Sequence, residues 1–203
     1  NTSLDPCQIP YQKLCEKMGY PCFGTRKQFQ VLTNKRMFKE YFSRYGVDVI
    51  QTYCMDDIRT NKAEYPILVK PVDSRGSRGQ SICMCREDVG KAVEDAKKES
   101  STGEIVMERF MGEHDDFSVA YLVVEGNPVL VRAGDRYQGT QKMGLHNVAV
   151  AAAEPSKYLD MYMQNVHKYV VNGIKGLGIQ NGLVFMQGFI DKDTVRFYDP
   201  GFR

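Results

Sequence analysis

A lysine at the end of a short strand, followed by a loop of small and basic residues, could bind the phosphates of a nucleotide. Residues 65–79 read YPILVKPVDSRGSRG, in which a β-favouring Ile-Leu-Val run leads to Lys70. Strand alternation would turn this lysine toward a ligand, and a buried ammonium needs an anionic partner. The loop residues expected to contact phosphate are Ser74, Gly76, Ser77 and Gly79. We expect a nucleotide triphosphate, and the alternative is a surface hairpin with a solvated lysine.

A second stretch joins a strand to a cluster of acidic residues and could hold the rest of a nucleotide. Residues 106–119 read VMERFMGEHDDFSV. The strand backbone near Met107 could pair with the edge of an adenine, and Glu108 could accept a hydrogen bond from its exocyclic amine. Asp115 or Asp116 is placed to hold ribose hydroxyls. The alternative is an ordinary solvated turn between two strands.

A third group of polar residues lies in the last two predicted strands. Gln187 stands among apolar residues, and Asp199 ends the partner strand shortly before Arg203. A hairpin would bring Gln187 and Asp199 side by side, and their oxygen atoms suit Mg²⁺, which completes its coordination with water and phosphate oxygens. Arg203 could clamp a transferring phosphoryl group. The alternative is a satisfied buried glutamine and a turn-capping aspartate.

For the acceptor substrate of such a site, the sequence offers one candidate binding residue. Arg136 follows Asp135 at the end of a predicted strand, and its guanidinium could bind an acceptor carboxylate. A surface ion pair between these two residues is equally compatible with the sequence. Residues 139–155 do not identify an amine or other nucleophile.

Composition limits the classes of function that these residues could serve. The chain has 203 residues, of which 42% are hydrophobic and 26% charged, and its formal net charge is +2. These values are typical of one globular domain or two small lobes, and they predict neither a nucleic-acid surface nor a membrane partner. The six cysteines show no metal-binding spacing, so we expect free thiols in the cytoplasm. The patterns GxxxxGK[ST] and GxGxxG are both missing, which argues against P-loop and Rossmann nucleotide sites.

The hydrophobic periodicity predicts helices packed on antiparallel sheets, an α+β fold, rather than a doubly wound parallel sheet. We expect helices over residues 10–18, 35–45, 87–99 and 156–175. Thr33 and Asn34 would supply the N-cap of the second helix. We expect strands over residues 47–53, 67–70, 80–85, 105–110, 117–124, 129–133, 182–190 and 194–198. Residues 56–64 would form a polar linker, and residues 134–155 a loop with an embedded apolar run.

The sequence also suggests a division into three parts. Residues 1–32 would be the tail of an upstream domain of the same chain, with a linker. Residues 33–125 would form a first lobe that carries the glycine-rich loop. Residues 126–203 would form a second lobe that stops after the metal-binding strand.

Taken in order, these stretches resemble the ATP-grasp superfamily, in particular its carbamoyl-phosphate-synthase-like members. Thr33-Asn34-Lys35 is similar to the segment that opens the ATP-binding region, and Lys70 with its loop is similar to the strand lysine and glycine-rich loop. Met107-Glu108 resembles the adenine hinge. The run Asp116-Phe-Ser-Val is similar to the pattern in which an acid holds ribose. Gln187 and the segment from Asp199 to Arg203 resemble the metal and triphosphate end.

The resemblance implies two α+β lobes with antiparallel sheets that hold ATP and Mg²⁺ between them. It implies a ligase that activates a small-molecule carboxylate as an acyl phosphate for attack by an amine or similar nucleophile. Lys35 and Lys70 would take the inner phosphates, and the loop backbone would cover the outer ones. Lys70 and Arg203 would be catalytic, with Arg203 and Mg²⁺ stabilising the transferring group.

Two departures from the family pattern keep other functions open. Many members carry Glu-x-Asn-x-Arg where this chain has Asp199-Pro-Gly-Phe-Arg203, so Gly201 offers no metal ligand and Asp199 is the only carboxylate there. We therefore expect Mg²⁺ to arrive mainly with the nucleotide phosphates. From the resemblance we also expect that the Rossmann-like domain that members normally carry is missing from the start of this sequence. An ATP-binding regulatory module without turnover and a non-catalytic interaction domain are the alternatives.

Overall fold

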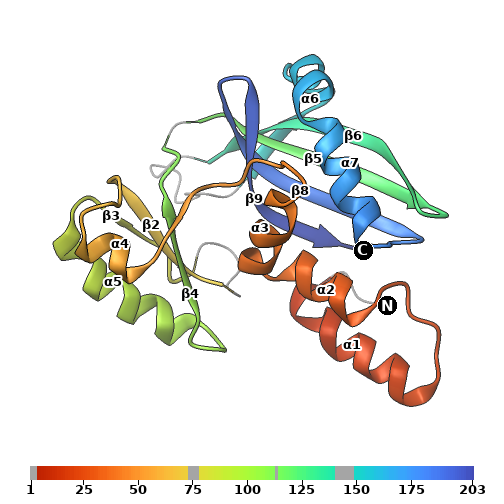
Figure 1. The fold of residues 1–203 in the computed structure, drawn as a ribbon, viewed down its shortest axis with the longest axis horizontal. Coiled ribbons are helices and arrows are strands. Elements are labelled where there is room, and N and C mark those ends of the chain that lie inside the picture. The colour runs from red at the N-terminus through yellow and green to blue at the C-terminus, as the bar shows by residue number, and fades with distance from the viewer. Residues whose placement is uncertain (1–3, 73–77, 113, 140–148) are drawn as a thin grey trace. The chain divides into compact units, whose positions relative to one another are not determined.

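The chain folds into two compact units (Figure 1). The computed structural model describes residues 4–72, 78–112, 114–139 and 149–203. Of these, residues 4–49, 114–139 and 149–203 belong to the larger unit, and residues 50–72 and 78–112 to the smaller unit.

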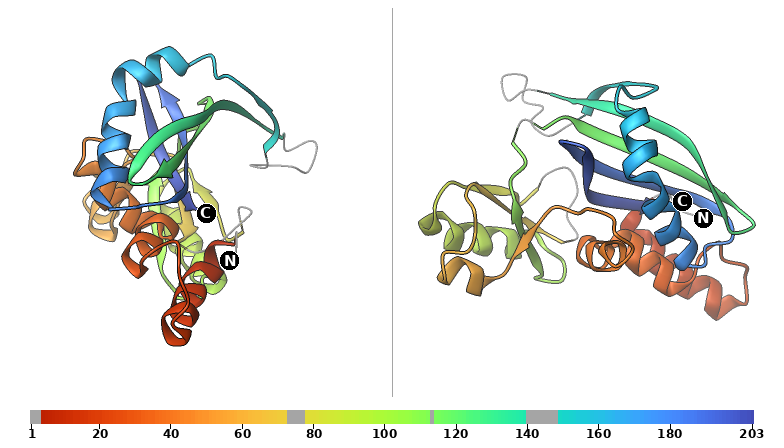
Figure 2. Two further views of the ribbon diagram at one scale, coloured as in Figure 1. Left: turned by 90° about the vertical axis from the view of Figure 1, so that its right-hand side faces the viewer. Right: turned by 45° about the horizontal axis from the view of Figure 1, so that its top comes forward.

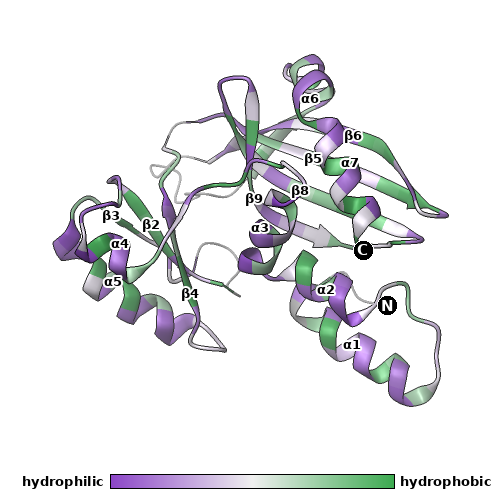
Figure 3. Ribbon diagram, viewed as in Figure 1, coloured by the Kyte–Doolittle hydropathy of each residue, from purple (hydrophilic) through white to green (hydrophobic). Residues whose placement is uncertain are grey.

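The smaller unit is a four-stranded antiparallel sheet in the order β1-β4-β2-β3. Its strands are β1 (Thr52–Tyr53), β2 (Ile67–Pro71), β3 (Ser81–Cys83) and β4 (Ile105–Arg109). The short helix α4 (Met55–Arg59) precedes β2, and the longer α5 (Arg86–Glu99) follows β3. Val89, Ala92 and Ala96 recur at helical spacing on α5 and pack with Ile67 and Val69 of β2. Hydrophobic and hydrophilic residues accordingly alternate around α5 (Figure 3).

The larger unit contains a five-stranded antiparallel sheet in the order β7-β6-β5-β8-β9. Its strands are β5 (Asp116–Val124), β6 (Asn127–Gln138), β7 (Ala149–Ala153), β8 (Gly182–Asp191) and β9 (Thr194–Phe202). In this register Asp116 lies opposite Arg136, and Gln187 lies opposite both Ser118 and Asp199. These polar positions of four strands therefore share one region of the sheet.

Helices cover one face of this sheet and enclose the main core. They are α2 (Arg26–Thr33), α3 (Lys35–Ser43), α6 (Leu159–Asn165) and α7 (His167–Gly176), while α1 (Asp5–Met18) packs against α2. Phe117, Val119 and Tyr121 of β5 are buried in one cluster with Phe42 of α3 and Ile174 of α7. Figure 2 shows α6 and α7 running one after the other along the sheet. Strand alternation directs Asp116 and Ser118 to the other face.

Side-chain caps fix where α2 and α3 begin. Thr25 and Gln28 form a capping box at the start of α2. The Asn34 side chain accepts hydrogen bonds from the backbone N–H groups of Arg36 and Met37, at 3.0 and 3.1 Å. Asn34 is thus the N-cap of α3, as the sequence predicted, and Lys35 is the first helical residue. Thr33 instead ends α2, where its hydroxyl donates to the carbonyl of Phe29.

The structure corrects several sequence-based boundaries. Residues 26–33 form α2, which was not predicted, and residues 55–59 form α4 inside the expected linker. Residues 149–153 form β7 rather than part of a loop, because β6 runs on to Gln138 and offers it a pairing edge. The expected strand over residues 47–53 is reduced to β1 and a single bridge between Val49 and Phe197. The predicted helix 156–175 is two helices, α6 and α7.

The division of the chain also differs from the expected one. Strand β5, expected in the first lobe, pairs with β6 and β8 in the larger unit. Residues 4–32, expected as the tail of another domain, pack into the same unit. Phe29 is fully buried in the main core, and the Gln8 amide donates to the carbonyl of Phe202 at 2.9 Å. Long-range packing, which periodicity does not report, produces this division.

The cysteines and the lengths of the helices can be read directly from the structure. All six cysteines are free, as predicted. Across the described ranges, every helix is too short or too polar to cross a membrane.

We predict that Asn34→Ala destabilises the larger unit by about 1 kcal/mol, since two N–H groups at the start of α3 lose their acceptor. Urea denaturation would measure the change in the free energy of unfolding. Asn34→Asp keeps an acceptor oxygen and serves as the control. Equal losses in both variants would contradict the capping role.

We predict that His167 makes the stability of the protein depend on pH. Its Nδ1 lies 2.8 Å from the Tyr121 hydroxyl, and burial lowers the pKa of the ring. The unfolded chain, in which histidine has a pKa of about 6.5, therefore takes up the proton first as the pH falls. The free energy of unfolding should decrease below that pH, and His167→Gln should show a shallower decrease in urea titrations between about pH 7.5 and 5. Identical slopes would contradict this role.

Candidate functional site

The predicted phosphate-binding lysine lies in the smaller unit and is paired with a buried glutamate. Lys70 on β2 and Glu108 on β4 occupy diagonal positions on one face of the sheet, since Lys70 lies opposite Val106 and Leu68 opposite Glu108. The Lys70 ammonium contacts the Glu108 carboxylate, and the two side chains are 5% and 1% exposed. Such burial requires a paired charge. Lys70 therefore lies on the face of the sheet opposite the α5 core.

This pairing changes what Glu108 offers a ligand. The sequence suggested that its carboxylate accepts from an adenine amine, whereas in this structure that carboxylate binds Lys70. Met107, also expected at the adenine edge, directs its side chain into the core of the smaller unit. Its backbone pairs with Val69 and Tyr53 of the neighbouring strands.

Most residues of the predicted phosphate loop lie outside the part of the chain that the structure describes. Ser74, Gly76 and Ser77 lie outside the described residues. Gly79 is described and has a positive φ of 67°. A Cβ there would lie 2.8 Å from the Cβ of Glu99, so the position requires glycine for both its conformation and its close packing.

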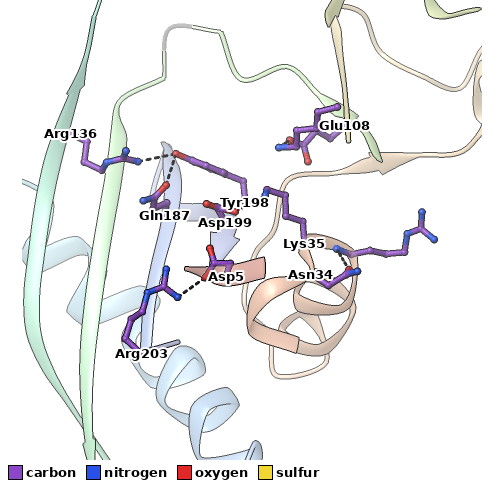
Figure 4. A network of polar contacts seen from close by, with 11 residues as sticks. Asp5, Asn34, Lys35, Glu108, Arg136, Gln187, Tyr198, Asp199 and Arg203 are labelled. Atoms are coloured by element: carbon purple, nitrogen blue, oxygen red, sulfur yellow. Dashed lines mark hydrogen bonds and ion pairs between the residues drawn. The ribbon is translucent and has the colours of Figure 1, made fainter. Parts of the chain in front are cut away.

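The larger unit places a second polar cluster on the sheet face opposite its helices. Asp116 begins β5 and is only 5% exposed. Its carboxylate accepts from Gln138 at 2.8 Å, lies 3.1 Å from the Arg136 guanidinium and is 3.3 Å from the Tyr198 hydroxyl. The same hydroxyl is 3.4 Å from the Gln187 amide oxygen. Figure 4 shows Tyr198 between Arg136 and Gln187.

Burial controls the protonation of this cluster. Desolvation raises the pKa of Asp116 above its ordinary value, although the hydrogen bond from Gln138 and the charge of Arg136 favour the ionised form. Desolvation also raises the pKa of Tyr198, so that it remains a neutral hydroxyl at physiological pH. The arrangement provides acceptor oxygens from Asp116 and a donor from Tyr198, and hydroxyl groups of a ribose could bind to such a set.

The predicted metal ligands face each other on the last hairpin. Gln187 of β8 lies directly opposite Asp199 of β9. The Asp199 carboxylate lies 2.9 Å from the ammonium of Lys35, with side chains 31% and 16% exposed. Lys35 reaches this position from the first turn of α3 (Figure 4). The structure thus brings together three residues that the sequence placed at the phosphate and metal end.

The residues around Gly201 explain why this position has no side chain. Phe185 lies opposite Gly201 in the register of β8 and β9. A Cβ at position 201 would overlap the Phe185 ring. The guanidinium of Arg203 lies over the same ring, 5.0 Å from its centroid. Arg203 also forms an ion pair with Asp5 of α1.

These donors fit Mg²⁺ that is bound partly by phosphate. Gln187 and Asp199 supply oxygen atoms, but the described residues contain no group of three or more His, Cys, Asp or Glu side chains able to hold a metal by themselves. Ser118, opposite Gln187, has a buried hydroxyl with no hydrogen-bond partner among the described residues. An orphaned hydroxyl beside these oxygens is consistent with a polar ligand at this face.

Sequence reasoning did not find every member of the cluster. Gln138 could have been found by alternation, since it is two positions beyond Arg136 on β6. Tyr198 directly precedes Asp199, and a β-bulge beside this position turns both toward Gln187. Asp5 gave no local signal, because it is 198 positions from Arg203.

Comparisons with known proteins identify the family of this chain. The family model described as the carbamoyl-phosphate synthase L chain, ATP-binding domain, matches residues 34–198. The formate-dependent phosphoribosylglycinamide formyltransferase of Wolinella succinogenes is 25% identical over 189 residues, which are 90% of this chain and 47% of that protein. The carbamoyl phosphate synthase large chain of Clostridium botulinum (strain Loch Maree) is 25% identical over 192 residues, 89% of this chain and 18% of that one. The chain thus spans about half, or less, of these relatives.

The fold agrees as well. The biotin carboxylase domain of Hydrogenobacter thermophilus 2-oxoglutarate carboxylase, solved with MgADP and bicarbonate, superposes with a TM-score of 0.79 at 20% identity. The match covers 96% of this chain and 45% of that one. Because the family model covers most of the sequence and the two antiparallel sheets match this architecture, the chain belongs to the carbamoyl-phosphate synthase L chain ATP-binding domain family of the ATP-grasp superfamily.

Proposed function

We propose that this chain binds Mg-ATP for a ligase reaction in which a carboxylate is activated as an acyl phosphate and then attacked by an amine or similar nucleophile. The observation that carries the proposal is the polar face of the larger unit, where Asp116, Gln187 and Asp199 meet Lys35 and Tyr198. Membership in a family of ATP-dependent ligases supports the same general reaction.

Each group would have a distinct role in that reaction. Asp116 would accept hydrogen bonds from ribose hydroxyls, and Lys35 would neutralise phosphate oxygens. Gln187 and Asp199 would hold Mg²⁺ against the phosphates, where the ion supplies charge stabilisation for phosphoryl transfer. Lys70 would also bind phosphate. Such a site works by position and charge, so it needs no protein nucleophile.

The guanidinium of Arg136 is already engaged within the polar face of the larger unit. Arg136 was expected to bind the acceptor carboxylate, but its guanidinium contacts Asp116 and the Tyr198 hydroxyl. With its side chain 19% exposed, it retains limited access to a ligand. We therefore propose that the main role of Arg136 is to orient Asp116, and that binding an acceptor carboxylate is a secondary role.

An ATP-binding regulatory module is the second candidate. The observation that favours it is Gly201, which leaves the hairpin one potential metal ligand short. The two functions differ in turnover. Release of ADP that depends on an added carboxylate would support the ligase, whereas saturable nucleotide binding without ADP release would support the regulatory module.

We predict that the protein binds Mg-ATP in preference to NAD, since the polar face provides cations for a triphosphate and the sequence lacks a dinucleotide fingerprint. Isothermal titration calorimetry with both ligands would test this. Saturable heat should appear with Mg-ATP only. Equal or tighter binding of NAD would contradict the proposed function.

We predict that removing the Lys70 charge weakens ATP binding by about tenfold to a hundredfold, the cost of losing one charge-assisted hydrogen bond. Lys70→Ala would leave Glu108 buried without this partner, so the informative variant is Lys70→Met combined with Glu108→Gln. Glu108→Gln alone keeps the lysine and is the matched control. Lys157→Ala removes an exposed lysine that pairs with Asp115, and should leave affinity unchanged. Equal affinity of the double variant and Glu108→Gln would show that Lys70 does not contact the nucleotide.

A further inference from the structure

The last hairpin leaves no room for a side chain at Gly201, two residues after the proposed metal ligand Asp199. Position 201 therefore supplies no side-chain ligand to a metal ion. Phe185 fills the space above Gly201, so any side chain at 201 would displace an aromatic ring. The guanidinium of Arg203 also packs over the Phe185 ring. The space that a side chain at position 201 would need is therefore filled by the Phe185 ring.

The carboxylate of Asp199 already has a cation beside it. Asp199 lies 2.9 Å from the Lys35 ammonium. Lys35 is held there by the α3 helix, whose first turn is fixed by the Asn34 cap. A carboxylate beside a protein ammonium attracts a second cation less strongly, because the two positive charges repel each other. Gln187, the other facing donor, is neutral.

From these two observations we propose that the nucleotide site takes one divalent cation per bound ATP, and that the ammonium of Lys35 provides the second positive charge. The single ion would be shared by Asp199, Gln187 and the phosphates. Phe185 and Gly201 would weaken the binding of a second ion by withholding a ligand, and Lys35 would weaken it further through the repulsion between its ammonium and the ion. This inference rests on the proposed nucleotide site and specifies how that site neutralises the triphosphate.

Counting bound Mn²⁺, which replaces Mg²⁺ and is visible by electron paramagnetic resonance, tests the proposal. The protein is saturated with a non-hydrolysable ATP analogue, and bound nucleotide and bound ion are measured on the same sample. The wild-type protein should bind one Mn²⁺ per nucleotide. Lys35→Met should bind a second ion, with affinity at least about tenfold tighter than any second ion in the wild type. Lys35→Arg keeps the cation and should return to one ion.

A second variant tests the aromatic closure separately. Phe185→Ala combined with Gly201→Asn gives the hairpin both the space and the ligand, and should raise the number of bound ions above one. Lys157→Met, which removes a lysine paired with a different carboxylate, should stay at one. Circular dichroism would confirm that each variant is folded.

The outcomes separate this inference from the proposed function. Two ions per nucleotide in the wild type would overturn the inference and leave nucleotide binding intact. A count that stays at one in Lys35→Met and in the Phe185→Ala/Gly201→Asn variant, with nucleotide bound, would also overturn it. Failure of the wild type to bind the ATP analogue would remove the proposed function, and this inference with it.

Discussion

Alternation along the strands of the larger unit constrains both its core and its site. On β5, Phe117, Val119 and Tyr121 pack under the helices, so the intervening Asp116 and Ser118 have to face the other way. Pairing with β6 and β8 then brings further polar side chains beside them. The same sheet that buries the aromatic core therefore assembles a polar surface, and a shift of one residue in register would exchange the two faces.

The buried charged groups of both units are stabilised by pairing with opposite charges rather than by water. Lys70 and Glu108 are almost completely buried together, and Asp116 is buried beside Arg136 and Gln138. Because the desolvation of one charge is offset by its partner, neither group of a pair can be altered alone without a structural cost. A ligand that binds Lys70 has to compete with an existing contact, and so does a metal ion that binds Asp199.

The last hairpin carries polar and aromatic groups next to each other. Gln187 and Asp199 face each other as oxygen donors, whereas the Phe185 ring packs over Gly201. Among the described residues, Asp199, Gln187 and Lys35 supply one carboxylate, one amide and one ammonium to the proposed metal site. Its net charge is less negative than that of a site with two or three carboxylates, so phosphate groups would meet less repulsion and metal ions less attraction.

The sequence by itself determined the local elements and the membership of the chain in a family. The lysine strand, the Asn34 cap, the amphipathic α5 and the final hairpin all depend on neighbours within a few residues, and the structure shows each of them. The resemblance to the ATP-grasp superfamily rested on such short patterns taken in order, and the family match confirms it.

Only the tertiary structure decided which charges meet. Lys35 with Asp199, Lys70 with Glu108 and Arg203 with Asp5 join residues that are far apart in the sequence, and no local pattern links them. The same holds for the placement of β5 in the larger unit and for the Phe185 ring over Gly201. The physical reason is that sheet register and packing bring these groups together, and both depend on the whole fold rather than on neighbouring residues.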